Sequence, residues 1–166
     1  MEEALPTVAE AAVGDGDGDG EVYRIRPLEI ADISKGFSDL LSQLSPSAPL
    51  TEGAFRARFG ELAALGADHL VLVAEDASTG LLAAAGAVLV ERKFIRSCGR
   101  VGHVEDVVVD AAARGRGLGE RVVRRLVEHA RARGCYKVIL NCTPELRAFY
   151  AKCGFVEKNV QMGLYF

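Results

Sequence analysis

The segment Arg114-Gly115-Arg116-Gly117-Leu118-Gly119 lies between an expected strand and the expected start of a helix. The first N–H groups of a helix have no partners inside the helix, and glycines let an anion approach the backbone closely. Arg114 and Arg116 add positive charge. The segment therefore predicts a site for a phosphate or pyrophosphate, although for the loop alone a glycine-rich turn without a ligand remains an alternative.

Three known patterns of phosphate-binding loop can be compared with this segment. A Walker A loop ends in Gly-Lys-Ser/Thr, whereas this one continues Gly119-Glu120-Arg121 and offers no hydroxyl for magnesium. A dinucleotide fingerprint has the spacing GxGxxG in the first βα unit, whereas here the spacing is GxGxG and the unit is late in the chain. The third is the acetyl-CoA loop of the GNAT superfamily, Gln/Arg-x-x-Gly-x-Gly/Ala, which RGRGLG resembles at every fixed position.

Two carboxylates and one phenol supply the groups that acyl transfer to an amine needs: a proton acceptor and a proton donor. Glu105 and Asp106 interrupt an apolar strand. Adjacent strand residues point to opposite faces, so both acids are exposed only if the strand is irregular, and an edge strand exposing one acid is the alternative. Tyr150 is the candidate acid, because a phenol with a pKa near 10 stays protonated at neutral pH; a half-buried packing role is its alternative.

The elements that must position these groups follow from periodicity. We expect strands at 22–26, 69–75, 81–94, 102–110, 135–142 and 155–166, and helices at 29–44, 51–65, 118–133 and 144–153, with Thr51 as N-cap and Gly66 as C-cap of the second helix. The order β-αα-β-β-β-α-β-α-β predicts a mixed α/β domain with an antiparallel meander and a βαβ crossover. Residues 1–20 read as a disordered acidic Gly/Asp tail, and 21–166 as one domain.

Composition narrows the class of protein. The chain has 166 residues, 49% of them hydrophobic and 26% charged, as in a globular enzyme or binding module. The net charge of -3 does not favour nucleic acid or an anionic membrane as a partner. We expect no transmembrane segment and no secretory signal, and we expect the four cysteines, Cys98, Cys135, Cys142 and Cys153, to be reduced thiols with no metal or disulfide role. The expected compartment is the cytosol.

The segment from Glu91 to Phe155 carries a more specific resemblance. ERKFIRSCGRVGHVEDVVV, RGRGLG, GCYKVILNC and FYAKCGF resemble the glucosamine 6-phosphate N-acetyltransferases of the GNAT superfamily. The resemblance implies the GNAT fold, a central mostly antiparallel mixed sheet flanked by helices. It also implies direct transfer, in a ternary complex, from acetyl-CoA to the amine of D-glucosamine 6-phosphate, giving N-acetylglucosamine 6-phosphate and CoA for UDP-N-acetylglucosamine biosynthesis. A GNAT enzyme for a protein or another small amine, and a non-catalytic acyl-CoA-binding module, are the alternatives.

The resemblance also implies residue roles. Catalysis falls to Glu105 and Asp106 with Tyr150. Acetyl-CoA is assigned to the main chain of Val107 and Val109 and to Arg114, Gly115, Arg116, Gly117, Leu118, Gly119 and Glu120. The acceptor is assigned to Ser45, Lys93, Phe94, Ile95, Arg96, Glu105, Asp106, Tyr136, Lys137 and Asn141. Tyr136 and Lys137 are expected to reach a neighbouring subunit's site, which implies a homodimer, and no metal is implied.

Two departures from the family pattern concern the acceptor. Asn141 stands where some relatives have Asp, so it can hydrogen-bond an amine but not neutralise it. The chain ends Leu164-Tyr165-Phe166, where some relatives carry a basic residue for the phosphate. The cytosolic expectation leaves open a peripheral attachment to the cytosolic face of an internal membrane.

Overall fold

A computed structural model describes residues 22–46 and 48–166. One sheet contains five strands in the order β1-β2-β3-β4-β5: Tyr23–Pro27, His69–Asp76, Leu82–Arg92, Arg100–Val109 and Cys135–Ile139. The pairs β1–β2, β2–β3 and β3–β4 are antiparallel, and β5 runs parallel to β4. The expected mixed, mostly antiparallel sheet is therefore confirmed, while the expected 1–20 tail lies outside the described residues.

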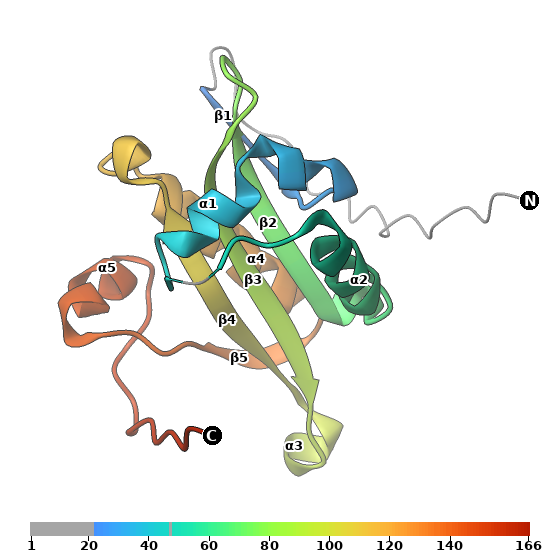
Figure 1. Cartoon of the computed structure of the whole chain (residues 1–166). Helices are drawn as coiled ribbons and strands as arrows, with labels where there is room; N and C mark the ends of the chain where they lie inside the picture. Colours follow the sequence, from blue (N-terminus) through green and yellow to red (C-terminus); the bar gives the residue numbers. More distant parts are fainter. Residues whose placement is uncertain (1–21, 47) are drawn as a thin grey trace, which may run out of the picture.

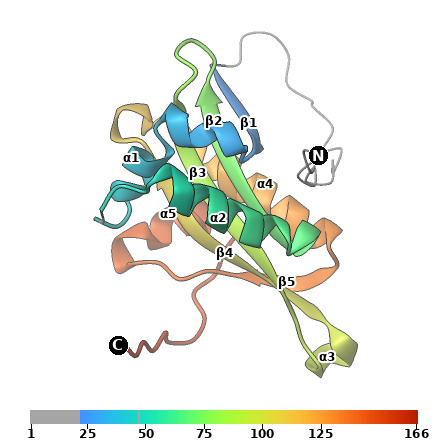
Figure 2. The same ribbon diagram turned by 45° about the vertical axis from the view of Figure 1, so that its right-hand side comes forward.

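Helices cover both faces of this sheet (Figures 1 and 2). The long helix α4, Leu118–Ala132, packs on one face, and the shorter helices α1, Phe37–Ser42, and α2, Glu52–Ala63, lie over the other. Short turns and helices complete the chain: η1 Ile30–Lys35, η2 Gly66–Asp68, α3 Ile95–Cys98, η3 Ala111–Ala113, η4 Pro144–Leu146 and α5 Arg147–Lys152. None of the helices in the described part of the chain is long and apolar enough to cross a membrane.

The contact between α4 and the sheet follows from one apolar stripe and one glycine. Leu118, Val122 and Leu126 of α4 are buried against the sheet, as the helical spacing of apolar residues predicts. On β4, a Cβ added to Gly102 would lie 2.8 Å from Cβ of Ala130 on α4. The helix therefore approaches the sheet more closely than any larger residue at 102 permits.

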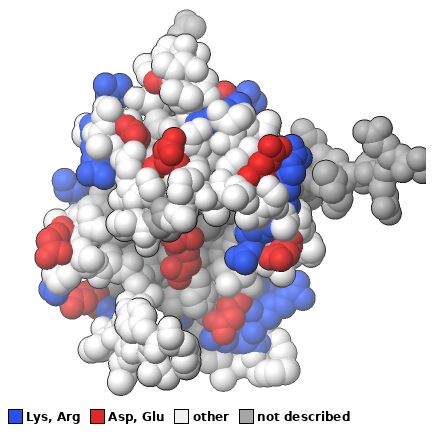
Figure 3. Space-filling model, viewed as in Figure 1, with Lys and Arg blue, Asp and Glu red and all other residues white. Residues whose placement is uncertain are grey.

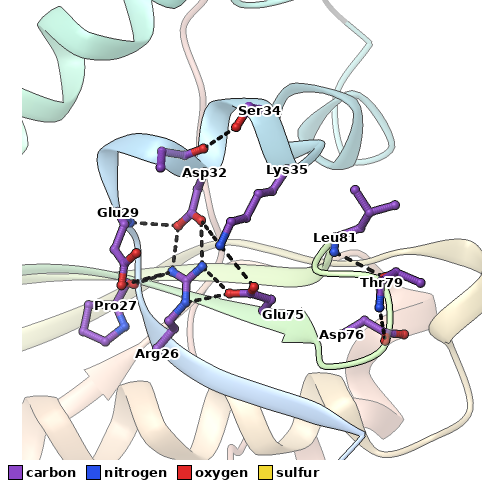
Figure 4. Close-up of polar contacts among 11 residues, drawn as sticks. Arg26, Pro27, Glu29, Asp32, Ser34, Lys35, Glu75, Asp76, Thr79 and Leu81 are labelled. Carbon is purple, nitrogen blue, oxygen red and sulfur yellow. Dashed lines mark hydrogen bonds and ion pairs between the residues drawn. The ribbon is translucent and has the colours of Figure 1, made fainter.

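The opposite face is anchored by a buried ion-pair network (Figure 4). The Arg26 guanidinium on β1 donates to both carboxylate oxygens of Asp32 at 2.8 and 2.7 Å and to Glu75 on β2 at 2.5 Å. Lys35 also binds Glu75 at 3.1 Å. Burial alone would raise the pKa of Asp32, but the hydrogen bonds from Arg26 and from the Glu29 backbone outweigh it and lower that pKa. The network fixes η1, which leads into α1, on the edge of the sheet.

Several expected boundaries differ from the structure; the helix expected at 144–153, for example, consists of η4 and α5, and the strand expected at 102–110 begins at Arg100. The helix expected at 29–44 is two pieces, η1 and α1, because Gly36 between them has φ +83, a left-handed conformation that interrupts a helix. Thr51 does cap α2, but Ala64 rather than Gly66 is its C-cap. The strand expected at 81–94 stops at Arg92, and β5 stops at Ile139 instead of 142.

The final strand expected at 155–166 is absent from this chain. Its apolar side chains are strongly exposed: Val160, Met162, Leu164, Tyr165 and Phe166. A strand needs a neighbour to satisfy its backbone N–H and C=O groups. No strand of the described chain lies alongside this segment, so its apolar alternation is not enough to make it a strand here.

Candidate active site

A bulge in β4 presents both carboxylates on the surface. Ala87 pairs with Glu105, but Ala85 pairs with Val108, so β4 contains one more residue than β3 over this stretch. Asp106 has φ +53, which is uncommon for a residue other than glycine and is typical of a bulge. Glu105 and Asp106 are both exposed. The irregular strand required for two adjacent exposed acids is thus present.

Acidic side chains are visible in a hollow near the centre of the face that carries α1 and α2 (Figure 3). Alternation places His69, Leu89 and His103 in one row across β2, β3 and β4, and Glu105 belongs to the next row of the same face. Burial lowers the pKa of His69, while the charge of Asp106 opposes that effect. Carboxylates and imidazoles therefore lie in neighbouring rows on this face of the sheet, a combination suited to an amine and to hydroxyl groups.

Beyond the bulge, β4 loses its partner on one side. β4 and β5 pair only from Arg100 to His103, whereas β4 continues to Val109. The chain after Ile139 leads away towards α5 (Figure 1). Residues 104–109 consequently offer backbone groups to which an extended ligand can add as a strand.

The predicted anion loop lies at the end of this open edge. Gly115 and Gly117 have φ +79 and +71, and α4 begins directly after them. A Cβ at either glycine would meet nothing within 4 Å, so the loop faces open space. At Gly119, by contrast, a Cβ would lie 3.2 Å from Phe149 Cζ and from Val109 Cγ2. The loop that precedes the first helical turn is thus exposed from Arg114 to Gly117, and glycine at 119 allows a close packing of α4 on β4 and α5.

The two arginines of the loop are both held by the protein. Arg116 donates to the Tyr23 hydroxyl at 2.8 Å, and Arg114 donates through Nε to the Val109 carbonyl at 3.2 Å. Leu118 is 1% exposed, so its side chain is part of the core under α4. Sequence reasoning missed Tyr23, because nothing in the pattern connects a residue of β1 with a loop more than ninety positions later.

Tyr150 on α5 belongs to the same site as Glu105. Its side chain is 8% exposed and packs edge-on against Phe149 and Phe155, with ring centroids 4.9 and 6.1 Å away. Burial raises the pKa of the phenol, and the nearby Cys142, Cys153 and Glu105 raise it further. The influence of Glu105 shows that the acid and the phenol are within electrostatic range. The Tyr150 phenol keeps its proton to a higher pH than a free tyrosine.

A second group of predicted residues lies elsewhere, at the protruding end of the β3–β4 hairpin (Figures 1 and 2). Phe94 is 96% exposed, and Arg96 and Lys137 lie 5.5 and 5.8 Å from the centroid of the Tyr136 ring. From Glu105 to the root of this turn at Gly99 the strand extends about 20 Å, at about 3.3 Å per residue. The structure thus separates these residues from the carboxylates of the same chain.

Three further predicted acceptor residues have different surroundings. Lys93 binds Glu91 at 2.5 Å, and Glu91 also contacts His103 Nε2 at 2.8 Å. Ser45 and Asn141 are exposed, Ser45 just after α1 and Asn141 just after β5. His103 was outside the predicted set, since a lone histidine beside glycines gives no functional signal.

The comparisons with known proteins agree with this geometry. Residues 36–155 match the Acetyltransferase (GNAT) family, and the chain belongs to that family. It is 85% identical over 166 residues, the whole of both chains, to "Glucosamine 6-phosphate N-acetyltransferase 1" of Oryza sativa subsp. japonica. It is 41% identical over 140 residues, 84% of this chain and 88% of the other, to the protein of that name from Dictyostelium discoideum.

A solved structure shows the same similarity. The crystal structure of glucosamine-6-phosphate N-acetyltransferase from Arabidopsis thaliana superposes with a TM-score of 0.86 at 48% identity, covering 88% of this chain and 99% of that one. An acetyltransferase from Trypanosoma brucei gives a TM-score of 0.79 at 35% identity, with coverage of 87% and 99%. The GNAT fold and the resemblance inferred from the four motifs are confirmed.

Proposed function

We propose that this chain transfers the acetyl group of acetyl-CoA to the amine of D-glucosamine 6-phosphate, giving N-acetylglucosamine 6-phosphate and CoA. One observation carries the proposal. A strand bulge exposes two carboxylates, of which Glu105 contributes to the raised pKa of the buried Tyr150, beside an open strand edge that ends at the glycine-rich loop before α4. The names of the similar proteins agree with this substrate pair.

The donor is held through the main chain. Its pyrophosphate binds the free N–H groups at the start of α4, from Arg114 to Glu120, with countercharge from Arg114 and Arg116. Its pantetheine arm adds alongside residues 107–109 of β4, where no strand competes for the backbone. The Val107 N–H then polarises the thioester carbonyl, which favours attack by an amine.

The chemistry removes two protons from the substrate ammonium and supplies one to sulfur. Glu105 receives the first proton through water, and Asp106 hydrogen-bonds the amine or a sugar hydroxyl. The free amine attacks the thioester carbon, the C–S bond breaks, and Tyr150 donates its proton to the departing sulfur. The second nitrogen proton passes through water to the tyrosinate and restores the phenol, while Glu105 releases the first proton to solvent. Burial suits Tyr150 to this step because the raised pKa keeps the phenol protonated until the thiolate forms.

The acceptor's phosphate requires a second subunit. Arg96 and Lys137 lie beside the Tyr136 ring near the β3–β4 turn, and Lys93 lies at the base of that turn, paired with Glu91. This cationic group is separated along β4 from Glu105 and Asp106. We therefore propose a homodimer in which this group, with Phe94, Ile95 and Tyr136, completes the partner's acceptor site, while Ser45 and Asn141 contact the acceptor within one chain. The unpaired apolar segment 155–166 supports such an interface, since a large exposed apolar surface marks a binding site. The four free thiols are compatible with the cytosol as the compartment.

A substrate panel tests the reaction. The enzyme is supplied with acetyl-CoA and with glucosamine 6-phosphate, glucosamine or a lysine peptide, and the acetylated product is measured by mass spectrometry. Of the three acceptors, we expect only glucosamine 6-phosphate to be turned over efficiently. A Glu105→Gln variant should be at least about 10-fold slower with this acceptor at pH 7. Equal rates with both sugars, or activity only on peptides, contradict the proposed substrate, and CoA binding without turnover would indicate a binding module.

Subunit complementation tests the shared site. Tyr150→Phe and Lys137→Ala impair different halves of one composite site, so a mixed dimer contains one intact site. Unfolding and refolding the two inactive variants together should restore about a quarter of wild-type activity, because half of the dimers are mixed and each has one good site. Lack of recovery, or a monomer in analytical ultracentrifugation at micromolar concentration, excludes this arrangement.

A further inference from the structure

The side chain of Gln43, directly after α1, makes two hydrogen bonds to the residues directly after β4. Its amide nitrogen donates to Asp110 Oδ2 at 2.7 Å, and its amide oxygen accepts the Ala111 N–H at 3.0 Å. Both bonds join residues more than sixty positions apart in the sequence. A glutamine that uses donor and acceptor together fixes its neighbour in one orientation.

Asp110 is the residue at which β4 turns into the donor loop. Its N–H donates to the Ala83 carbonyl at 2.8 Å, and its Oδ1 accepts the Ala112 N–H at 2.8 Å. The hydrogen bond from Gln43, ahead of that from Ala112, lowers the pKa of Asp110, so the carboxylate is charged at neutral pH. Four residues later the anion loop starts at Arg114. The direction in which that loop leaves the sheet is therefore set at Asp110.

Gln43 also belongs to the last turn of α1, next to the candidate acceptor-binding residue Ser45. It is the C-cap of α1, and its own N–H bonds the carbonyl of Leu40, which is buried in the sheet-facing core. Two residues on, the Ser45 N–H donates to the Leu41 carbonyl at 3.1 Å, so Ser45 is part of the same last turn. The side chain of Gln43 thus connects the turn that carries Ser45 with the junction that carries the donor loop.

We infer that Gln43 is a positioning residue that couples acetyl-CoA binding to acceptor binding. Donor binding at residues 114–119 holds the junction at Asp110, and Gln43 transmits that restraint to the last turn of α1. An acceptor that binds the already ordered turn loses less conformational entropy, which is positive cooperativity without a large structural change. By linkage the effect is reciprocal: each substrate tightens the binding of the other by one common factor.

This inference rests on the proposed function, because the second ligand is glucosamine 6-phosphate. The test uses free CoA, which binds the donor site but cannot react. The dissociation constant of CoA is measured by calorimetry without and with saturating glucosamine 6-phosphate, and the reverse titration checks reciprocity. For the wild-type protein we expect a ratio of about 5 to 10, the lower part of the usual range, because the bonds of Gln43 are solvent-exposed.

Gln43→Ala should bring that ratio to about 1 while each substrate alone still binds. A matched control is Ser42→Ala, one residue away, whose hydroxyl bonds only Asp39 of its own helix among the described residues and which should keep the wild-type ratio. Melting temperatures of both variants separate coupling from folding. A structural role alone would lower the melting temperature of Gln43→Ala and leave the ratio unchanged.

A double variant that exchanges the amide of Gln43 and the carboxylate of Asp110 tests whether the coupling can be restored. Gln43→Glu sets two carboxylates against each other and should abolish the coupling. Adding Asp110→Asn to Gln43→Glu restores it, because the new amide then donates to the new carboxylate while both backbone N–H groups keep their acceptors. Coupling that survives Gln43→Ala, or a wild-type ratio of 1, overturns the inference alone. Failure of the wild-type protein to bind glucosamine 6-phosphate at all overturns the proposed function and this inference with it.

Discussion

Replacing Tyr150 with phenylalanine removes a single oxygen from the candidate active site. The ring of Tyr150 packs against Phe149 and Phe155 at 4.9 and 6.1 Å, and a phenylalanine ring keeps both contacts. No hydrogen bond joins the hydroxyl to another group in the part of the chain that the structure describes. Tyr150→Phe therefore leaves no buried polar group without a partner, and we expect the free energy of unfolding to change by less than about 1 kcal/mol.

The expected loss of turnover follows from the role of the proton. A positioned general acid contributes about 10²- to 10⁴-fold, which is about 2.7 to 5.4 kcal/mol of the barrier at 1.36 kcal/mol per tenfold. The leaving group is a thiolate whose thiol has a pKa of about 8.5, so it is a fairly stable anion. We therefore expect Tyr150→Phe to lie near the lower end, about 10²-fold in kcat, with little change in the KM for either substrate.

The assay measures acetylated sugar at saturating acetyl-CoA and glucosamine 6-phosphate from pH 6 to 10, beside the melting temperature. Because burial raises the pKa of Tyr150 above its ordinary value of 10.0, the wild-type enzyme should not lose activity through ionisation of this phenol below about pH 9. Tyr165→Phe, at a side chain that is 95% exposed, is the matched control. An unchanged kcat in Tyr150→Phe would remove the phenol from the mechanism, and a lower melting temperature would reassign it to packing.

Three further predictions concern stability and the carboxylates. Asp32→Asn should lower the free energy of unfolding by about 3 to 5 kcal/mol in urea titrations, because it leaves the buried Arg26 charge without its main partner. The folded-state pKa of Asp32 lies below its ordinary 3.8, so this stability is present above pH 3.8 and is lost as pH falls further; equal acid stability of the wild type and Asp32→Asn would contradict the argument. Gly102→Ala should cost about 1 to 3 kcal/mol because its Cβ would lie 2.8 Å from that of Ala130, whereas Gly53→Ala, where nothing lies within 4 Å, should be neutral or stabilising, and similar melting curves for the two would refute the packing argument. Replacing Glu105 by Gln should lower kcat by at least about 10-fold without changing the melting temperature, and an unchanged kcat would assign the proton acceptor to another group.

Periodicity predicted α4 well, and the glycines predicted the turn before it, because both depend on local sequence. A 3.6-residue apolar stripe can be buried in only one way, and glycines at 115 and 117 suit left-handed conformations before a helix start. The prediction of a single helix at 29–44 was wrong for a reason that is also local. The apolar spacing continued across Gly36, but the left-handed φ of that residue divides the segment.

The bulge could be suspected but not located from the sequence. Two adjacent acids in an apolar strand indicated irregularity, yet the extra residue is defined only by the register of β4 against β3. The same holds for Gln43 and Tyr23, whose partners are distant in sequence and carry no recognisable pattern. The strand expected at 155–166 was predicted but did not form. Alternation of apolar residues shows that a segment can form a strand, but the strand also needs a neighbouring strand to pair with.

The sequence by itself determined the chemistry that this protein offers. The types and spacing of Arg114–Gly119, the acid pair and Tyr150 predict an anion loop with a proton acceptor and a proton donor. Only the tertiary structure decided how these groups are arranged. The bulge turns both acids outward, the divergence of β4 from β5 frees a backbone edge, and burial raises the pKa of Tyr150. It also separated the phosphate-binding candidates from the acids, because strand length and hairpin direction depend on pairing between distant segments.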